Sequence, residues 1–311
     1  MTDYLAQLDN FAVITLTGEE RVKYLQGQVT ADIHLLHNKN ALMGCHCDFK
    51  GKTWNVFYAV NQQDCIHLIS HRGGIQGSLP ELKKYAVFAK TDIDENDQLQ
   101  IFGGSGNKLQ TTIQNVFGDV PQQQRQVIAN ENGLVVCIDT ELPRYLVLLN
   151  KDAANSLVDQ YPSELSSSEL WQLQDIQQGI AHIEPATSNE YVPQMLNMQS
   201  LDAISFDKGC YMGQEMVART KFLGKNKRAT YILKGEHGQS LAAGDTLEMP
   251  IGDNWRRGGI VISCVSLASN TNESWMLAVL ANDTEIGAQF RSKADPSALF
   301  TVQPLPYSLE K

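Results

Sequence analysis

Cys210 is the residue of this chain whose surroundings favour covalent chemistry most clearly. It lies between Gly209 and Gly213, and glycine permits tight turns and a close approach of a ligand to the backbone. Residues 214–220 predict a short helix, so the thiol follows Lys208 and precedes a helix N-terminus. That electropositive setting favours the thiolate and makes the sulfur more nucleophilic. The alternative is a small buried thiol in a tight turn.

A basic run follows this segment directly. Five of the ten residues from Arg219 to Arg228 are cationic, although the chain has a formal net charge of −10. One interpretation is a solvated face. The other is an anion site for carboxylates or phosphates, which a folate polyglutamate tail or an RNA backbone would supply. On that second interpretation Arg219, Arg228 and the nearby Tyr211 are candidate ligand contacts.

A tryptophan lies in a predicted helix. Residues 166–169 form a capping-box pattern, and Gly179 is a natural stop. At about 100° per residue the helix has one apolar stripe, formed by Leu170, Leu173, Ile176 and Ile180. Trp171 falls on the polar side, where its indole could stack on a flat heterocycle or pack against a neighbouring domain. Gln177 falls inside the stripe, where a buried amide needs partners from the protein or from a ligand.

Two further patterns carry weaker signals. Cys45-His46-Cys47 is a candidate metal site by residue type. However, C-x-C is not the common zinc spacing, and no second ligand pair follows at a suitable distance. We expect a strand turning into a loop, with both thiols on one face, and no metal site. Residues 103–108 lack the order of a phosphate-binding loop, so we expect a glycine loop joining a strand to a helix.

The elements that must position these residues divide the chain into two regions, 1–226 and 227–311. In the first region the patterns predict strands over 11–18, 54–60, 65–70, 99–102, 134–139 and 145–149, and helices over 19–26, 78–85 and 108–117. In the second, short β-rich runs over 230–233, 259–263, 275–280 and 289–291 alternate with turn residues. The expected fold class is therefore α+β, with a small C-terminal β-barrel.

Composition limits the classes of function. The 311 residues are 42% hydrophobic, enough for a sizeable core. The N-terminus lacks the pattern of a signal peptide, no apolar run could span a membrane, and the six scattered cysteines are typical of reduced thiols, so we expect a cytoplasmic protein. The net negative charge opposes tight, non-specific nucleic-acid binding, although a local basic patch could still act.

Residues 208–215, KGCYMGQE, resemble the signature Lys-Gly-Cys-Tyr-x-Gly-Gln-Glu of the YgfZ family. The resemblance extends over nearly the whole chain, through residues 24–32, 46–52, 82–85, 254–257 and 304–309. It implies the scaffold of the glycine-cleavage T-protein, with two interleaved subdomains before the barrel. It further implies a tetrahydrofolate-binding accessory protein that maintains iron–sulfur enzymes of tRNA modification, such as a methylthio-transferase.

The same resemblance assigns roles to individual residues. Cys210, with Lys208 beside it, matches the key cysteine of the family. Trp171 matches a folate-contacting tryptophan, and a second such tryptophan falls at Phe11, which can stack but has no N–H to donate. Gln177 matches a glutamate that reads the pterin ring in relatives on the T-protein scaffold, and an amide would alter that recognition.

One expected group is missing. The T-protein's catalytic aspartate follows a Gly-Gly pair, and the corresponding residues here are Trp54 and Asn55. Neither is a carboxylate base, which argues against aminomethyl transfer and for a maintenance factor rather than an enzyme of a known class. A folate-dependent one-carbon transferase remains the second hypothesis. A tRNA-binding module that uses residues 219–228 is the third.

Overall fold

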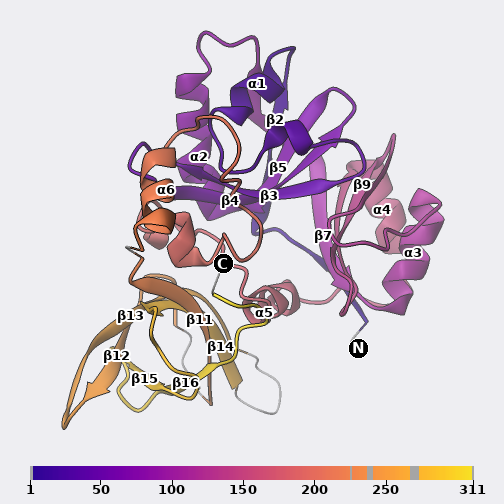
Figure 1. Ribbon diagram of the computed structural model, residues 1–311. Helices are drawn as coiled ribbons and strands as arrows, with labels where there is room; N and C mark the ends of the chain where they lie inside the picture. Colours follow the sequence, from indigo (N-terminus) through magenta and orange to yellow (C-terminus); the bar gives the residue numbers. More distant parts are fainter. Residues whose placement is uncertain (1–2, 225, 237–240, 267–272, 310–311) are drawn as a thin grey trace.

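The structure is a computed structural model that describes residues 3–224, 226–236, 241–266 and 273–309. In that part of the chain, two antiparallel five-stranded sheets and one closed barrel meet around a common centre (Figure 1). The α+β class and the C-terminal barrel predicted from the sequence are both confirmed. No helix of the described residues is long and apolar enough to cross a membrane.

The first sheet carries the N-terminal helices on one face. In order across the sheet its strands are β3 (Ala41–Cys47), β4 (Thr53–Gln62), β5 (Cys65–His71), β2 (Phe11–Thr17) and β6 (Asp92–Glu95). Helix α2 (Arg72–Tyr85) packs on it, with α1 (Arg21–Gln26) and the short 3₁₀ turn η1 (Ile33–Leu35) nearby. Helix α2 begins six residues before the prediction. Gly74 is needed there because an added Cβ would lie 2.1 Å from Oδ1 of Asn55.

The second sheet is covered by two other helices. Its order is β1 (Tyr4–Gln7), β7 (Leu99–Ser105), β10 (Arg144–Asn150), β9 (Gly133–Asp139) and β8 (Val127–Asn130), with α3 (Asn107–Phe117) and α4 (Lys151–Gln160) packed on it. The predicted glycine loop is wrong, because Gly103 and Gly104 lie inside β7. An added Cβ on Gly104 would lie 2.5 Å from the carbonyl oxygen of Tyr4, so glycine lets β1 pair closely with β7.

The barrel is formed by β11 (Arg228–Glu236), β14 (Glu273–Ala281), β13 (Asn254–Ser266), β12 (Thr246–Ile251), β15 (Gln289–Ser292) and β16 (Leu299–Gln303). The four predicted β runs lie in β11, β13, β14 and β15. The prediction missed β12 and β16.

The segment between the sheets and the barrel holds the molecule together. It contains α5 (Glu169–Gln177), the 3₁₀ turns η2 (Pro185–Thr187) and η3 (Pro193–Leu196), and α6 (Gln214–Phe222). Ile176 of α5 shares one hydrophobic cluster with Val56 of β4, Leu146 of β10 and Leu277 of β14. The two sheets and the barrel are therefore joined through a single core, and the tail after β16 returns to the region of α5 (Figure 1).

Candidate functional site

Trp171 lies inside the protein, with only 2% of its surface exposed. Of the two alternatives for the polar side of its helix, the burial agrees with packing against a neighbouring part of the protein, because α5 is covered on more than one side. Gln172 donates a hydrogen bond to the Cys264 carbonyl of the barrel, whereas Trp171 and Asp175, one turn apart, face Arg144 of β10. The polar side of α5 is therefore a buried side. Gln177, which was expected in the apolar stripe, is exposed at the end of the helix.

The indole of Trp171 is enclosed by its neighbours. The guanidinium carbon of Arg144 lies 4.1 Å from the ring centroid, a cation–π geometry. A Cβ added to Gly103 would lie 2.3 Å from Cε3 of the indole, which explains the glycine inside β7. A ligand cannot stack on this indole unless Arg144 moves away.

Arg144 and Asp175 form a buried ion pair behind that indole. Nη2 of Arg144 donates to Oδ1 of Asp175 at 2.8 Å, and His182 Nε2 lies 2.9 Å from Oδ2. Burial alone would raise the pKa of Asp175, but the Arg144 charge and the His182 hydrogen bond outweigh it and lower that pKa. Among the described residues, Nε and Nη1 of Arg144 have no hydrogen-bond partner although the side chain is 1% exposed.

Phe11 joins the same network from the first sheet. Its ring meets the rings of His71 and His182 edge-on, at centroid distances of 5.7 and 5.1 Å. Burial lowers the pKa of His71 to about 4, so the ring is uncharged at neutral pH; its Nε2 lies 3.3 Å from Oε1 of Glu184. The structure thus links Phe11 to Trp171 through His182, Asp175 and Arg144. Phe11 itself is 4% exposed.

Arg144 is also one of the residues that line a hollow of about 390 Å³. Both sheets, the segment after α5 and the C-terminal tail contribute to its walls. The tail is held there by a hydrogen bond from Tyr307 Oη to the Gly179 carbonyl at 2.8 Å. Apolar and aromatic walls come from Met43, Tyr58, Ile138, Ile180, Leu201 and Tyr307, and polar groups include Arg125, Arg144 and Gln178. Trp171, Phe11 and Gln177 are not part of this lining.

Cys210 lies in a second region, on the surface before α6. Its side chain is exposed, so the alternative of a small buried thiol is wrong. Helix α6 begins four residues later, at Gln214, after Gly213 with φ of +83°. A Cβ on Gly213 would lie 2.4 Å from the Asp48 carbonyl oxygen, so this turn needs a glycine both for its conformation and for its space.

Lys208 anchors the Cys210 turn. Its Nζ donates to the backbone carbonyls of Gln26, Val29 and Ala31 at 2.8, 2.7 and 2.6 Å. Burial lowers the pKa of Lys208 to about 8, with Asp32 opposing the fall, so the group stays protonated at neutral pH. All three N–H donors of the ammonium are used by the backbone. The buried Tyr211 packs beside it, with Nζ 5.1 Å from the ring centroid.

We expect Lys208→Met to lower the free energy of unfolding by about 2 kcal/mol, because it leaves three carbonyls without their shared donor. Urea unfolding of the two proteins measures the difference. Lys50→Met is the matched control, since Lys50 is exposed and its removal should change stability little. A Lys208→Met protein as stable as the wild type would contradict the anchoring role.

The two candidate arginines lie apart from the hollow. Arg219 is exposed on α6, where Nη2 pairs with Oε1 of Glu215 at 2.7 Å. Arg228 is exposed at the first position of β11. Lys225 of the same basic run lies outside the described residues. The structure thus brings Trp171 and Phe11 into one buried network and places Cys210, Arg219 and Arg228 elsewhere.

Asn55, which with Trp54 was expected at the place of the T-protein's catalytic aspartate, is a buried residue of β4. It is 1% exposed and donates from Nδ2 to Ser70 Oγ at 2.9 Å. Nearby, Cys45 and Cys47 are buried in one cluster, and His46 Nδ1 lies 2.8 Å from Ser78 Oγ. No group of three or more His, Cys, Asp or Glu side chains among the described residues could hold a metal ion.

Sequence reasoning missed Arg144, Asp175 and His182. Arg144 opens an apolar strand run and looks like the polar end of a strand. Asp175 carried a usable signal, because it lies one helical turn after Trp171 and must share its face. Pairing an aromatic with an acid on one helix face would have indicated a buried cationic partner.

Comparison with known proteins identifies the family. The model of the YgfZ β-barrel domain matches residues 226–295. The chain is 38% identical over 307 residues to the tRNA-modifying protein YgfZ of Serratia proteamaculans (strain 568), covering 98% of this chain and 92% of that protein. It is 39% identical, with the same coverage, to the tRNA-modifying protein YgfZ of Yersinia pestis (strain Pestoides F).

A solved structure shows the fold. The glycine cleavage system aminomethyltransferase T from Bartonella henselae is similar with a TM-score of 0.73, at 12% identity, over 99% of this chain and 87% of that one. The expected T-protein scaffold is therefore confirmed. With two sheets, a barrel of the matching type and relatives aligned along almost its whole length, the chain belongs to the YgfZ family.

Proposed function

We propose that this protein is a folate-binding accessory factor in tRNA modification, with the folate held in the hollow beside Arg144. The observation that carries the proposal is the buried Arg144 guanidinium, two of whose nitrogens have no hydrogen-bond partner among the described residues. A buried cation with unused donors is costly unless a ligand supplies acceptors. The carbonyl and ring nitrogens of a pterin, or a glutamate carboxylate, are acceptors of that kind.

The rest of the hollow suits the same ligand. Its volume of about 390 Å³ lies in the range of small-molecule sites. Tyr58 and Tyr307 offer aromatic walls for a flat ring, and Gln178 offers both a donor and an acceptor. In this proposal Trp171 and Phe11 are positioning residues: Trp171 supports Arg144 from behind, and Phe11 supports His182.

We expect Arg144→Lys to weaken tetrahydrofolate binding by about 1.5–3 kcal/mol, because lysine keeps the charge beside Asp175 but loses the planar fork. Calorimetric titration of tetrahydrofolate measures the change. Arg72→Lys, at an exposed ion pair with Glu95, is the matched control and should bind as the wild type does. If the Arg144→Lys protein binds tetrahydrofolate as tightly as the wild type does, the proposal that the ligand occupies this hollow is wrong.

The role in tRNA modification is supported by the names of the relatives, which are tRNA-modifying proteins YgfZ. We propose further that the clients are iron–sulfur enzymes such as a methylthio-transferase, and that Cys210 supplies the reactive thiol. Methylthiolated adenosine in tRNA should fall in cells that lack the protein and should not recover with Cys210→Ser. Normal levels in those cells, including under oxidative stress, would exclude this role.

A folate-dependent aminomethyl transferase is less well supported. Neither Trp54 nor Asn55, the residues expected at the place of the catalytic aspartate, is an acid, and the Asn55 side chain is closed in between Ser70 and Gly74. Turnover of an aminomethyl-lipoyl carrier with tetrahydrofolate would revive that alternative.

A further inference from the structure

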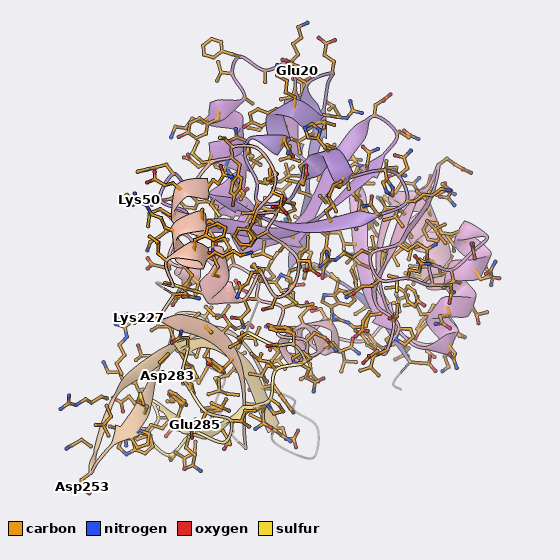
Figure 2. The ribbon with its side chains drawn as sticks, in the orientation of Figure 1. Glu20, Lys50, Lys227, Asp253, Asp283 and Glu285 are labelled. Carbon is orange, nitrogen blue, oxygen red and sulfur yellow. The ribbon has the colours of Figure 1, made fainter. Side chains whose placement is uncertain are left out.

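The outer flank of α6 is basic, although the whole chain is acidic. We call this surface the α6 flank and define it by the turn 48–52, helix α6 and residues 226–228. Its cations are Lys50, Lys52, Arg219, Lys221, Lys227 and Arg228, and its acids are Asp48 and Glu215. Figure 2 places Lys50 beside α6 and Lys227 just below it, with the acidic Asp253, Asp283 and Glu285 farther along the barrel.

Contacts join these segments into one surface. An added Cβ on Gly51 would lie 2.9 Å from Cβ of Met216, so the turn 48–52 packs directly on α6. Lys52 Nζ donates to the Glu190 carbonyl at 2.9 Å, next to Tyr191. Asn226, beside Lys227 and Arg228, donates from Nδ2 to the Gln194 carbonyl at 3.2 Å, and Gln194 Nε2 donates to the Val217 carbonyl of α6 at 2.6 Å. Cations from three separate stretches are therefore brought onto one surface.

Aromatic rings are exposed among these charges. Phe49 is 70% exposed, with Lys50 Nζ 5.4 Å from its ring centroid. Phe222 is 69% exposed and meets Phe206 edge-on at 6.3 Å, and Lys221 Nζ lies 3.7 Å from the Phe206 centroid. Exposed rings beside lysines form the combination that binds single-stranded nucleic acids, through base stacking and phosphate contacts.

A cavity of about 300 Å³ opens beneath the C-terminal half of α6. Lys221 and Phe206 form part of its wall, and five residues with amide side chains form most of the rest: Gln194, Asn197, Gln199, Asn226 and Asn282. The amides of Asn197, Asn226 and Asn282 form hydrogen bonds within the protein, so Gln194 and Gln199 are the candidates for recognition of a ligand. Gln194 is 4% exposed, and its Nε2 is fixed on the Val217 carbonyl at 2.6 Å. Oε1 of Gln194 and Oε1 of Gln199 have no hydrogen-bond partner within the described part of the chain.

Amides around an aromatic ring fit the edge and the face of a nucleobase. Unstacked bases of RNA are recognised by stacking on aromatic side chains and by hydrogen bonds to their edges. Unpaired acceptor oxygens call for the N–H donors that such edges carry. An acidic protein would satisfy the cations, but it would leave these amide acceptors and the aromatic wall without their complement.

We propose that the α6 flank binds single-stranded RNA, with the phosphates on its lysines and arginines and one unstacked base in the amide cavity. The choice of RNA as the polyanion rests on the proposed role in tRNA modification. The inference adds to that role a direct contact between this protein and the nucleic acid, on the helix that follows Cys210. The amide cavity and the hollow at Arg144 share no lining residue, although Asn197 of the cavity donates to Tyr307 of the hollow at 3.3 Å. The charge-reversed lysines lie outside that contact, so folate and RNA binding can be tested independently with them.

The first test is fluorescence anisotropy with a labelled synthetic RNA hairpin that has an open loop, titrated over a series of salt concentrations. The double variant Lys221→Glu/Lys227→Glu should bind on the order of tenfold more weakly, and the slope of log affinity against log salt should fall by about 1.4, or about 0.7 per lost phosphate contact. Lys39→Glu/Lys151→Glu, which reverses two exposed lysines on other parts of the molecule, is the charge-matched control and should bind as the wild type does.

The second test separates the cavity from the charges. Gln199→Leu should weaken binding of the open-loop hairpin about tenfold and leave both the salt slope and the binding of a blunt duplex unchanged. Gln76→Leu, on the exposed side of α2, is its control.

Several results would overturn the proposal. One is a wild-type protein that does not bind the hairpin at physiological salt, and another is a charge-reversed protein that binds it as tightly as the wild type. A third is a client protein that binds this flank without RNA and no longer binds after the same substitutions. Tetrahydrofolate titration of the double variant should match the wild type. If wild-type protein binds RNA but not folate, the proposed function fails and this inference stands.

Discussion

Arg144→Leu should lower the free energy of unfolding by about 3–5 kcal/mol. The substitution leaves Asp175 as a carboxylate that is 3% exposed and has lost its cationic partner, and breaking a buried pair in this way carries that cost. It also removes the group that lies over Trp171. Urea unfolding, followed by tryptophan fluorescence and by circular dichroism, measures the loss.

A double-mutant cycle identifies its cause. Asp175→Leu alone should be about as harmful, because it leaves Arg144 buried without its carboxylate. The double variant Arg144→Leu/Asp175→Leu should recover much of the stability, since neither charge remains buried. Additive losses in the double variant would show that the two charges are not coupled, and that packing around Trp171 carries the effect.

Acidification from pH 7 to pH 5 should remove roughly 5 kcal/mol of stability through three histidines, His46, His67 and His71. Burial lowers the pKa of each to about 4. An unfolded histidine has a pKa of about 6.5. Between pH 6.5 and pH 4 the unfolded chain therefore binds more protons than the folded chain, and the free energy of unfolding decreases as the pH is lowered. Each contributes about 2 kcal/mol at pH 5. The raised pKa of Glu184 opposes the loss at the acidic end of this range.

Substitution of one histidine checks that assignment. In His46→Gln protein the stability difference between pH 7 and pH 5 should shrink by about 2 kcal/mol, since one titrating group is gone. The exposed His34 provides the control, and His34→Gln should leave the difference unchanged. A pH dependence unaffected by His46→Gln would mean that this ring does not stay neutral in the folded protein.

Much of the fold could be predicted from local patterns, and the failures have physical causes. The strands β2, β5 and β9 followed from their β-branched and apolar runs. Helix α2 was predicted short because Gly73 and Gly74 disfavour helix, yet they are required by close contacts with residue 183 and with Asn55. Tertiary contacts outweighed the propensity of these residues, and such contacts are not visible in a local window.

The site was predicted less well than the fold. The glycine turn around Cys210 and the helix that carries Trp171 could be inferred from residue types and spacing. The orientation of Trp171 could not, because the helical wheel assumes that the polar side of a helix faces water. Here that side faces Arg144, whose position in the next sheet depends on strand order. The residues of a buried polar network do not recur at a regular spacing in the sequence, so hydrophobic periodicity cannot reveal them.

The hollow beside Arg144 is walled by stretches that lie far apart in the chain. Met43 and Tyr58 come from the first sheet, Ile138 and Arg144 from the second, and Tyr307 from the tail. Neither sheet alone contains the site, so a partly folded intermediate that has completed one of them has nowhere to bind ligand. Bound folate would therefore stabilise only the fully assembled chain, by RT ln(1 + [L]/Kd), and would slow unfolding wherever release of the tail precedes the loss of the sheets.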